Sequence, residues 1–201
     1  MYKKISQIIT HKFVTLGIIS ENDYEIYKYG LELLIALLST TIAIILTSIL
    51  INKFFETILY LVGFFSVRVI CGGYHAKRHY TCFAITNLSY FLFVFLDYCF
   101  FEKPYMVFIT GFMTIVSSVL IVAFAPIEHP DNPMTEYRKS RNRFFSLLLT
   151  FLICIIYCAS LVLENISPYI FNYTTGIFLA ALAILTAKIE NSIIKRKEER
   201  L

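Results

Sequence analysis

Six apolar runs, each about as long as a membrane-spanning helix, constrain this chain more than any other feature. A helix that crosses a hydrocarbon core of roughly 30 Å needs about 20 mostly apolar residues. Apolar and aromatic residues make up 58% of the 201 residues, whereas soluble domains are roughly 45–50% apolar. The chain is therefore expected to be an integral membrane protein. The expected spans are Tyr29–Ile51, Phe54–Cys71, Cys82–Phe101, Tyr105–Ala125, Phe144–Leu163 and Tyr169–Ala187.

The fold class that follows is an all-α integral membrane protein with about six transmembrane or re-entrant helices. Segment 54–71 is short and carries Arg68 near its end, so a re-entrant or tilted segment is an alternative there. No repeat, low-complexity linker or change of composition divides the sequence. We expect residues 1–201 to form a single polytopic membrane domain.

The first 20 residues are expected to form an amphipathic helix in the membrane interface. Apolar side chains recur there at helical spacing, and basic and polar ones fall mostly on the opposite side. Polar residues interrupt any continuous apolar core, which argues against a signal peptide. Ser20 and Asp23 have the spacing of a capping box for the next helix. The apolar set is Ile5, Ile8, Ile9, Phe13 and Leu16.

Basic residues predict the orientation, because short cytoplasmic loops retain Lys and Arg. With six spans, one side receives only Lys53 and Lys103, and the other receives the remaining clusters. We therefore expect a multi-pass cell-membrane protein whose termini, loop 72–81 and basic loop 126–143 are cytoplasmic. The cations lie at segment ends, without the interleaved aromatic residues of a nucleic-acid-binding stripe, so no nucleic-acid partner is expected. Glu32 and Asp97 are interpreted as charges near the cytoplasmic and outer faces.

Two thiols, two imidazoles and a Gly72-Gly73 turn lie between the second and third spans. Cys82 stands at the expected start of a helix and follows several cations, and both features favour a thiolate. His75 is the candidate general base, but in a continuous helix it would lie about 10 Å from Cys82. The chain must therefore turn back, and the two glycines permit such a turn.

Three alternatives within this loop remain open. His79 is three residues from Cys82 and would share its helix face if the third helix began early. Cys71 is an alternative nucleophile, although its place after an apolar run suggests a buried thiol. All four residues together, spaced Cys-x3-His-x3-His-x2-Cys, could also bind zinc, although the spacing matches no standard zinc signature.

The residues Arg68, Gly73, His75 and Cys82, set in a small polytopic protein, resemble the signature of the AgrB family. These are membrane cysteine endopeptidases of Gram-positive quorum sensing. The resemblance implies that His75 and Cys82 are catalytic, that Arg68 supports the site, and that no cofactor or metal is needed. It is sharply specific only between Arg68 and Cys82.

The resemblance also implies a substrate and a reaction. Such enzymes remove the C-terminal tail of an AgrD-like precursor peptide through a cysteine thioester, and a thiolactone or lactone ring then closes. Membrane lipid and a homodimer are the other expected partners. A peptide exporter and a zinc-dependent membrane peptidase are the alternative functions. Cations that could hold an acidic tail are Arg138, Lys139, Arg141 and Arg143.

Overall fold

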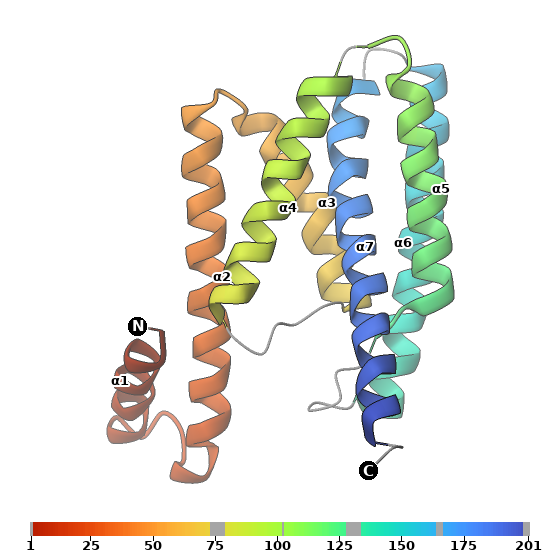
Figure 1. Ribbon diagram of the computed structural model, residues 1–201. Coiled ribbons are helices and arrows are strands. Elements are labelled where there is room, and N and C mark those ends of the chain that lie inside the picture. Colours follow the sequence, from red (N-terminus) through yellow and green to blue (C-terminus); the bar gives the residue numbers. More distant parts are fainter. Residues whose placement is uncertain (1, 73–78, 102, 128–133, 164–166, 199–201) are drawn as a thin grey trace. The chain divides into compact units, whose positions relative to one another are not determined.

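The computed structural model describes residues 2–72, 79–101, 103–127, 134–163 and 167–198. Seven α-helices and one 3-10 turn make up these described residues (Figure 1), and α2 to α7 each contain a segment long and apolar enough to cross a membrane. This result confirms the predicted fold class. The elements are α1 Tyr2–Thr15, η1 Glu21–Asp23, α2 Tyr24–Leu50, α3 Phe54–Cys71, α4 His79–Phe100, α5 Met106–Phe124, α6 Glu136–Val162 and α7 Ser167–Glu198.

Contacts divide the chain into two compact units, which are described separately. The first unit contains residues 1–52 and 76–88, and therefore α1, α2 and the start of α4. The second unit contains residues 53–75 and 89–201, and therefore α3, the rest of α4, and α5 to α7.

In the first unit, α1 ends where glycine allows the chain to reverse. Gly17 has φ +67°, a left-handed conformation that glycine adopts without strain. Its N–H donates to the Val14 carbonyl at 2.9 Å, and the Ile18 N–H donates to the Phe13 carbonyl at 2.9 Å. This pair of bonds is a Schellman motif, which satisfies carbonyls that a helix end would leave unpaired.

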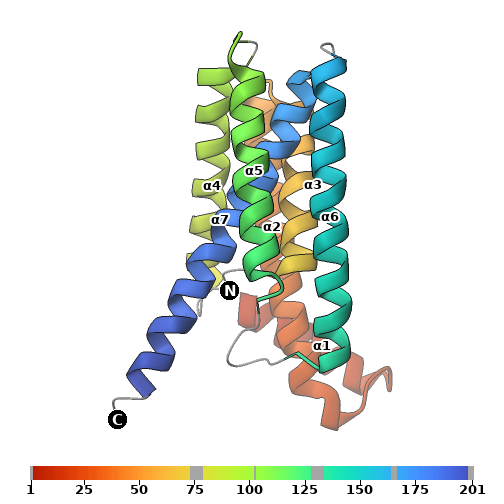
Figure 2. The same ribbon diagram turned by 90° about the vertical axis from the view of Figure 1, so that its right-hand side faces the viewer.

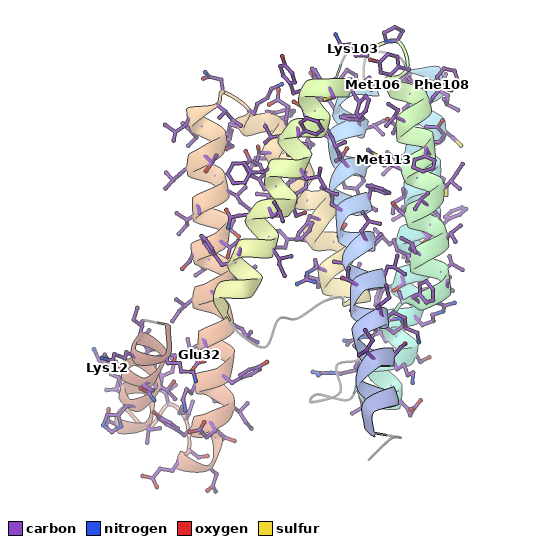
Figure 3. All side chains as sticks on the ribbon, in the orientation of Figure 1. Lys12, Glu32, Lys103, Met106, Phe108 and Met113 are labelled. Carbon is purple, nitrogen blue, oxygen red and sulfur yellow. The ribbon has the colours of Figure 1, made fainter. Side chains whose placement is uncertain are left out.

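The helix α1 packs on α2 through small polar side chains. Ser6 and Thr10 are fully buried, and the Ser6 hydroxyl donates to Glu32 of α2 at 3.3 Å. Glu32 lies on the side of α2 that faces α1 (Figure 3). Ile8 remains 69% exposed. Leu16 is 63% exposed as well, whereas Ile9 and Phe13 are half-buried, so only part of the apolar side of α1 is left for a membrane interface.

The expected capping box at Ser20 has different geometry. Ser20 precedes η1, and its hydroxyl donates to the Asp23 carboxylate at 2.7 Å rather than accepting a backbone N–H. The two side chains of the pair bond each other, so neither caps the helix backbone.

In the second unit, α7 is the most buried helix, and α3, α5 and α6 lie beside it (Figure 2). The helices α3, α5 and α7 run in one direction and α6 runs in the other (Figure 1). Met106 and Met113 of α5 pack with Phe171 of α7. Phe108 is exposed, and Figure 3 shows it pointing away from the two methionines.

Glycines bring α3 and α7 into close contact. A Cβ atom on Gly63 would meet the Tyr173 carbonyl oxygen, and one on Gly176 would meet the Tyr60 carbonyl oxygen. Small residues of this kind let helix backbones approach in a membrane, where the hydrophobic effect does not drive helix association.

The helix α4 contacts α3 through longer side chains. Thr57 and Tyr90 hydroxyls lie 3.1 Å apart, and those of Tyr60 and Ser89 lie 3.0 Å apart. The Tyr60 ring stacks on Phe93 with centroids 4.5 Å apart. These contacts hold the C-terminal half of α4 against α3.

Three helix boundaries test the expected spans. The helix α3 is unbroken over the expected bounds, which argues against a re-entrant segment. The helix α6 begins at Glu136 rather than Phe144, and α7 continues to Glu198 rather than ending at Ala187. The apolar run therefore marks only part of each of these two helices.

Candidate active site

The segment from Arg68 to Cys82 is only partly described. Arg68 and Cys71 belong to the last turn of α3, and Gly72 follows it. Residues 73–78 lie outside the described residues, and residues 79–82 are described as helix backbone without side chains. The roles expected for Gly73 and His75 therefore lie outside the described residues and stay predictions.

Cys82 is the fourth residue of α4, in its first turn. Backbone N–H groups in the first turn have no partner within the helix, and the helix dipole there favours negative charge. This position agrees with the sequence-based placement of Cys82 at the start of a helix. A thiolate is more nucleophilic than a thiol, so the position suits a nucleophilic cysteine.

The helix α4 also includes His79, as its first residue. Residues three apart on a helix are neighbours on one face. The helix thus starts early enough for His79 to share a face with Cys82, so His79 is a rival to His75 as the general base. Cleavage by variants of His75 and His79 decides which imidazole is the general base.

Cys71 is a packed thiol. The residue is fully buried, and its Sγ lies 3.3 Å from the Ser146 hydroxyl of α6. Its carbonyl accepts a bond from the Ile127 N–H at 3.0 Å. Reactive cysteines are at least partly exposed, so this environment disfavours Cys71 as the nucleophile.

Gly72, expected from the sequence to permit a turn, also makes a close backbone contact. Its φ of +75° lies in the left-handed region, and a Cβ atom here would lie 2.9 Å from the Ile127 carbonyl oxygen. Backbone strain and a backbone clash would both oppose any other residue. Gly72 therefore sets the direction in which the chain leaves α3.

Arg68 lies one turn before the end of α3 and is half-buried. The centre of its guanidinium is 6.0 Å from the Phe64 ring centroid, a cation–π distance. The side chain is thus partly packed along its own helix, close to the start of the segment that contains His75.

The four cations expected to hold a substrate tail do not lie in a loop. Arg138, Lys139, Arg141 and Arg143 belong to the first two turns of α6. The first three are exposed. Only Arg138 and Lys139 lie in the first turn of α6, where a cation opposes the helix dipole.

Arg143 differs from the other three. It is half-buried, and its Nη1 donates to the carbonyl oxygen of Ala125 at 2.6 Å. This contact places its guanidinium at the end of α5 rather than toward solvent.

Sequence reasoning missed Ser146, Ala125 and Ile127, which contact the end of α3 or Arg143. No local pattern marks them, because Ser146 meets Cys71 across 75 residues of sequence.

Asp97 lies near the C-terminal end of α4, and its expected place near the outer face stays a prediction. Its carboxylate is 2.9 Å from the Lys53 ammonium and is 3% exposed. It lies on α4 about 22 Å along the helix from Cys82, too far for a role in the same catalytic group.

No group of three or more His, Cys, Asp or Glu side chains that could hold a metal occurs among the described residues. The side chains of His75, His79 and Cys82 are not among those residues, so this finding does not bear on the zinc alternative.

The chain matches the family model described as Accessory gene regulator B over residues 2–190. It is similar to the Accessory gene regulator protein B of Staphylococcus haemolyticus (strain JCSC1435). The two are 26% identical over 129 residues, which cover 64% of this chain and 67% of that protein. No solved structure matches the chain significantly.

Proposed function

The chain belongs to the accessory gene regulator B family of quorum-sensing membrane proteins, and we propose that it is a cysteine endopeptidase that processes an AgrD-like precursor peptide. The observation that carries the proposal is the position of Cys82 in the first turn of α4, within a family match over nearly the whole chain. That position stabilises the thiolate which such chemistry needs.

In the first step, His75 takes the proton of the Cys82 thiol, and the sulfur attacks the carbonyl carbon of the scissile peptide bond. The carbon–nitrogen bond breaks, and the leaving amine of the tail takes the proton from the imidazolium. The leader and core of the peptide remain on Cys82 as a thioester.

In the second step, a thiol or hydroxyl within the bound peptide attacks the thioester carbonyl. His75 moves the proton of that thiol or hydroxyl to the departing Cys82 sulfur, and a thiolactone or lactone ring closes. Hydrolysis competes with ring closure, so a site that limits water favours the ring.

The other candidate residues are proposed to bind the substrate or to position the catalytic loop. Exposed Arg138, Lys139 and Arg141 are suited to an acidic tail and to anionic lipid, since all three are cations that solvent reaches near one end of α6. Arg68 orients the site.

The orientation belongs to the proposal as well. An even number of spans returns the chain to its starting side, and the basic residues then place both termini and the catalytic loop in the cytoplasm. The precursor is cut on that side, and a homodimer is the default assembly.

Substitution of the nucleophile tests the mechanism. We expect Cys82→Ala to abolish cleavage of a precursor tagged after its tail, measured by mass spectrometry in membrane vesicles, while the protein still accumulates. Cys154→Ala is the matched control, because Cys154 is an exposed cysteine on α6, and it should cleave normally. Full cleavage by Cys82→Ala would refute the mechanism.

Comparison of the imidazoles and treatment with a chelator separate the alternatives. His75→Ala should be nearly as damaging as Cys82→Ala, and His79→Ala mild; the reverse order would make His79 the base. A zinc peptidase would lose activity with a chelator and resist alkylation, and an exporter would cleave nothing.

The acyl-enzyme is tested with a precursor whose internal nucleophile is replaced by Ala. The first cut should proceed without ring closure, and an adduct that hydroxylamine cleaves should accumulate or hydrolyse to the linear acid. A metal-activated water would form no such adduct.

A further inference from the structure

The C-terminal end of α3 is held by the connection between α5 and α6 through both backbone and side chain. The Ile127 N–H donates to the Cys71 carbonyl at 3.0 Å, and the Cys71 sulfur lies 3.3 Å from the Ser146 hydroxyl. The Ser146 hydroxyl also lies 2.8 Å from the Asn142 carbonyl of its own helix. The last residue of α3 is thereby fixed at two points.

Arg143 holds that connection in place. Its guanidinium donates to the Ala125 carbonyl at 2.6 Å, and Ala125 is the residue that caps the end of α5. A cation is favourable at a helix C-terminus, and a hydrogen bond from a charged donor is stronger than a neutral one. Ala125 and Ile127 are 4% and 7% exposed, so water competes little with these contacts.

Gly72 allows the backbone at the end of α3 to lie against the backbone of the α5–α6 connection. Its left-handed backbone passes so close to Ile127 that a Cβ atom would lie 2.9 Å from the Ile127 carbonyl oxygen. The end of α3 and the α5–α6 connection are therefore matched by their backbones as well as by side chains.

We infer that residues 125–127 form a clasp on the end of α3 and that Arg143 is the positioning residue that keeps this clasp closed. The clasp is inferred from the contacts above alone. Its effect on catalysis rests on the proposed function. His75 follows Gly72 by three residues, so the clasp fixes the point from which the chain runs to the general base.

The rival role for Arg143 is direct attraction of an acidic substrate tail, as proposed for Arg141. The two arginines differ in burial, since Arg141 is exposed and Arg143 is half-buried. Their kinetic effects should differ too. Loss of a binding charge raises KM, whereas loss of a positioning contact lowers kcat, because the reacting groups are no longer held in the productive geometry.

The first experiment measures the clasp without any catalysis. Cys71 is buried, so the rate at which N-ethylmaleimide labels it reports opening of the α3 end. The parent is the full chain in membranes with Cys71 as its one thiol. It carries Cys82→Ser, Cys99→Ala, Cys154→Ala and Cys158→Ala.

In that parent, Arg143→Met should speed Cys71 labelling about tenfold, the effect of losing one hydrogen bond from a charged donor. Arg143→Lys keeps a donor for the Ala125 carbonyl and should label within about twofold of the parent. Arg141→Met removes the same charge from the same helix and should label like the parent. Labelling of Arg143→Met at the parental rate would overturn the clasp.

The second experiment measures cleavage of the tagged precursor by enzymes that retain all cysteines. Arg143→Met should lower kcat about tenfold with little change in KM, Arg143→Lys should restore kcat, and Arg141→Met should mainly raise KM. A raised KM with unchanged kcat in Arg143→Met would assign that residue to substrate binding and overturn the positioning role. If the parent enzyme cleaves no precursor, the proposed function fails, while the labelling rates still decide the clasp.

Discussion

The helix α3 meets its neighbours α7 and α4 in two contrasting ways. Against α7, Gly63 and Gly176 let the two backbones touch, and carbonyl oxygens occupy the space where a Cβ atom would be. Against α4, contact depends on tyrosine, threonine and serine hydroxyls, on the stacked rings of Tyr60 and Phe93, and on the ion pair between Lys53 and Asp97. One interface is built from backbone and the other from the ends of side chains.

The difference matters because lipid offers helices no hydrophobic reason to associate. Backbone contact gives dense van der Waals packing that only the movement of a whole helix can relieve. Side-chain pairs can shift by rotamer changes. The C-terminal half of α4 is thus held to α3 by the more adjustable kind of contact, and the two interfaces should respond differently to substitution.

The largest effect is expected at the backbone interface. Gly176→Ala places a Cβ atom against the Tyr60 carbonyl oxygen and 2.9 Å from the Phe64 nitrogen. Both are backbone atoms, so relief requires the helices to move apart, and we expect a loss of about 3 kcal/mol. Thermal unfolding in detergent, followed by circular dichroism, measures the loss.

Two glycines provide matched controls for that substitution. A Cβ on Gly111 would meet the Tyr157 hydroxyl group, the far end of a side chain that can turn away, so Gly111→Ala should cost about 1 kcal/mol. Gly30 has nothing within 4 Å, so Gly30→Ala should stabilise α2 by about 0.5–1 kcal/mol. Equal losses at Gly176 and Gly111 would show that the two kinds of contact do not differ.

Much of the fold could be predicted from the sequence, because apolar runs of this length have few alternatives in lipid. The boundaries of α6 and α7 could not. The apolar run of α6 starts at Phe144, but Thr135 caps the helix by accepting the Arg138 N–H at 3.4 Å. Charged residues such as Arg138 and Lys195 favour helix intrinsically, so charge ends the membrane segment without ending the helix.

The candidate site shows the same limit. The pattern around Cys82 predicted a thiol at a helix start, because local signals mark that position. The packing of Cys71 against Ser146 and the contact of Arg143 with Ala125 join distant segments, and sequence periodicity carries no information about such pairs. From the sequence, Arg143 is therefore expected to act like the other three cations, although its contact with Ala125 sets it apart from them.

A smaller effect is expected at the ion pair. Lys53→Met removes the ammonium 2.9 Å from the Asp97 carboxylate, and the change should cost about 2 kcal/mol, below the full penalty for a buried pair because Lys53 is 32% exposed. The double variant with Asp97→Asn removes the buried charge as well and should recover most of the loss. A double variant no more stable than Lys53→Met would mean that the charge of Asp97 is not what makes the single change costly.

The smallest effect is expected at the hydroxyl pair. Tyr90→Phe removes one partner of the 3.1 Å contact with Thr57, and hydrogen bonds between membrane helices contribute about 0.6 kcal/mol on average. Thr57→Val should cost a similar amount, and the double variant no more than either one, because the second change removes a group whose partner is already gone. Unfolding of all four proteins in the same detergent gives the coupling energy. Strictly additive losses would show that the two hydroxyls contribute independently and that the contact between them carries no coupling energy.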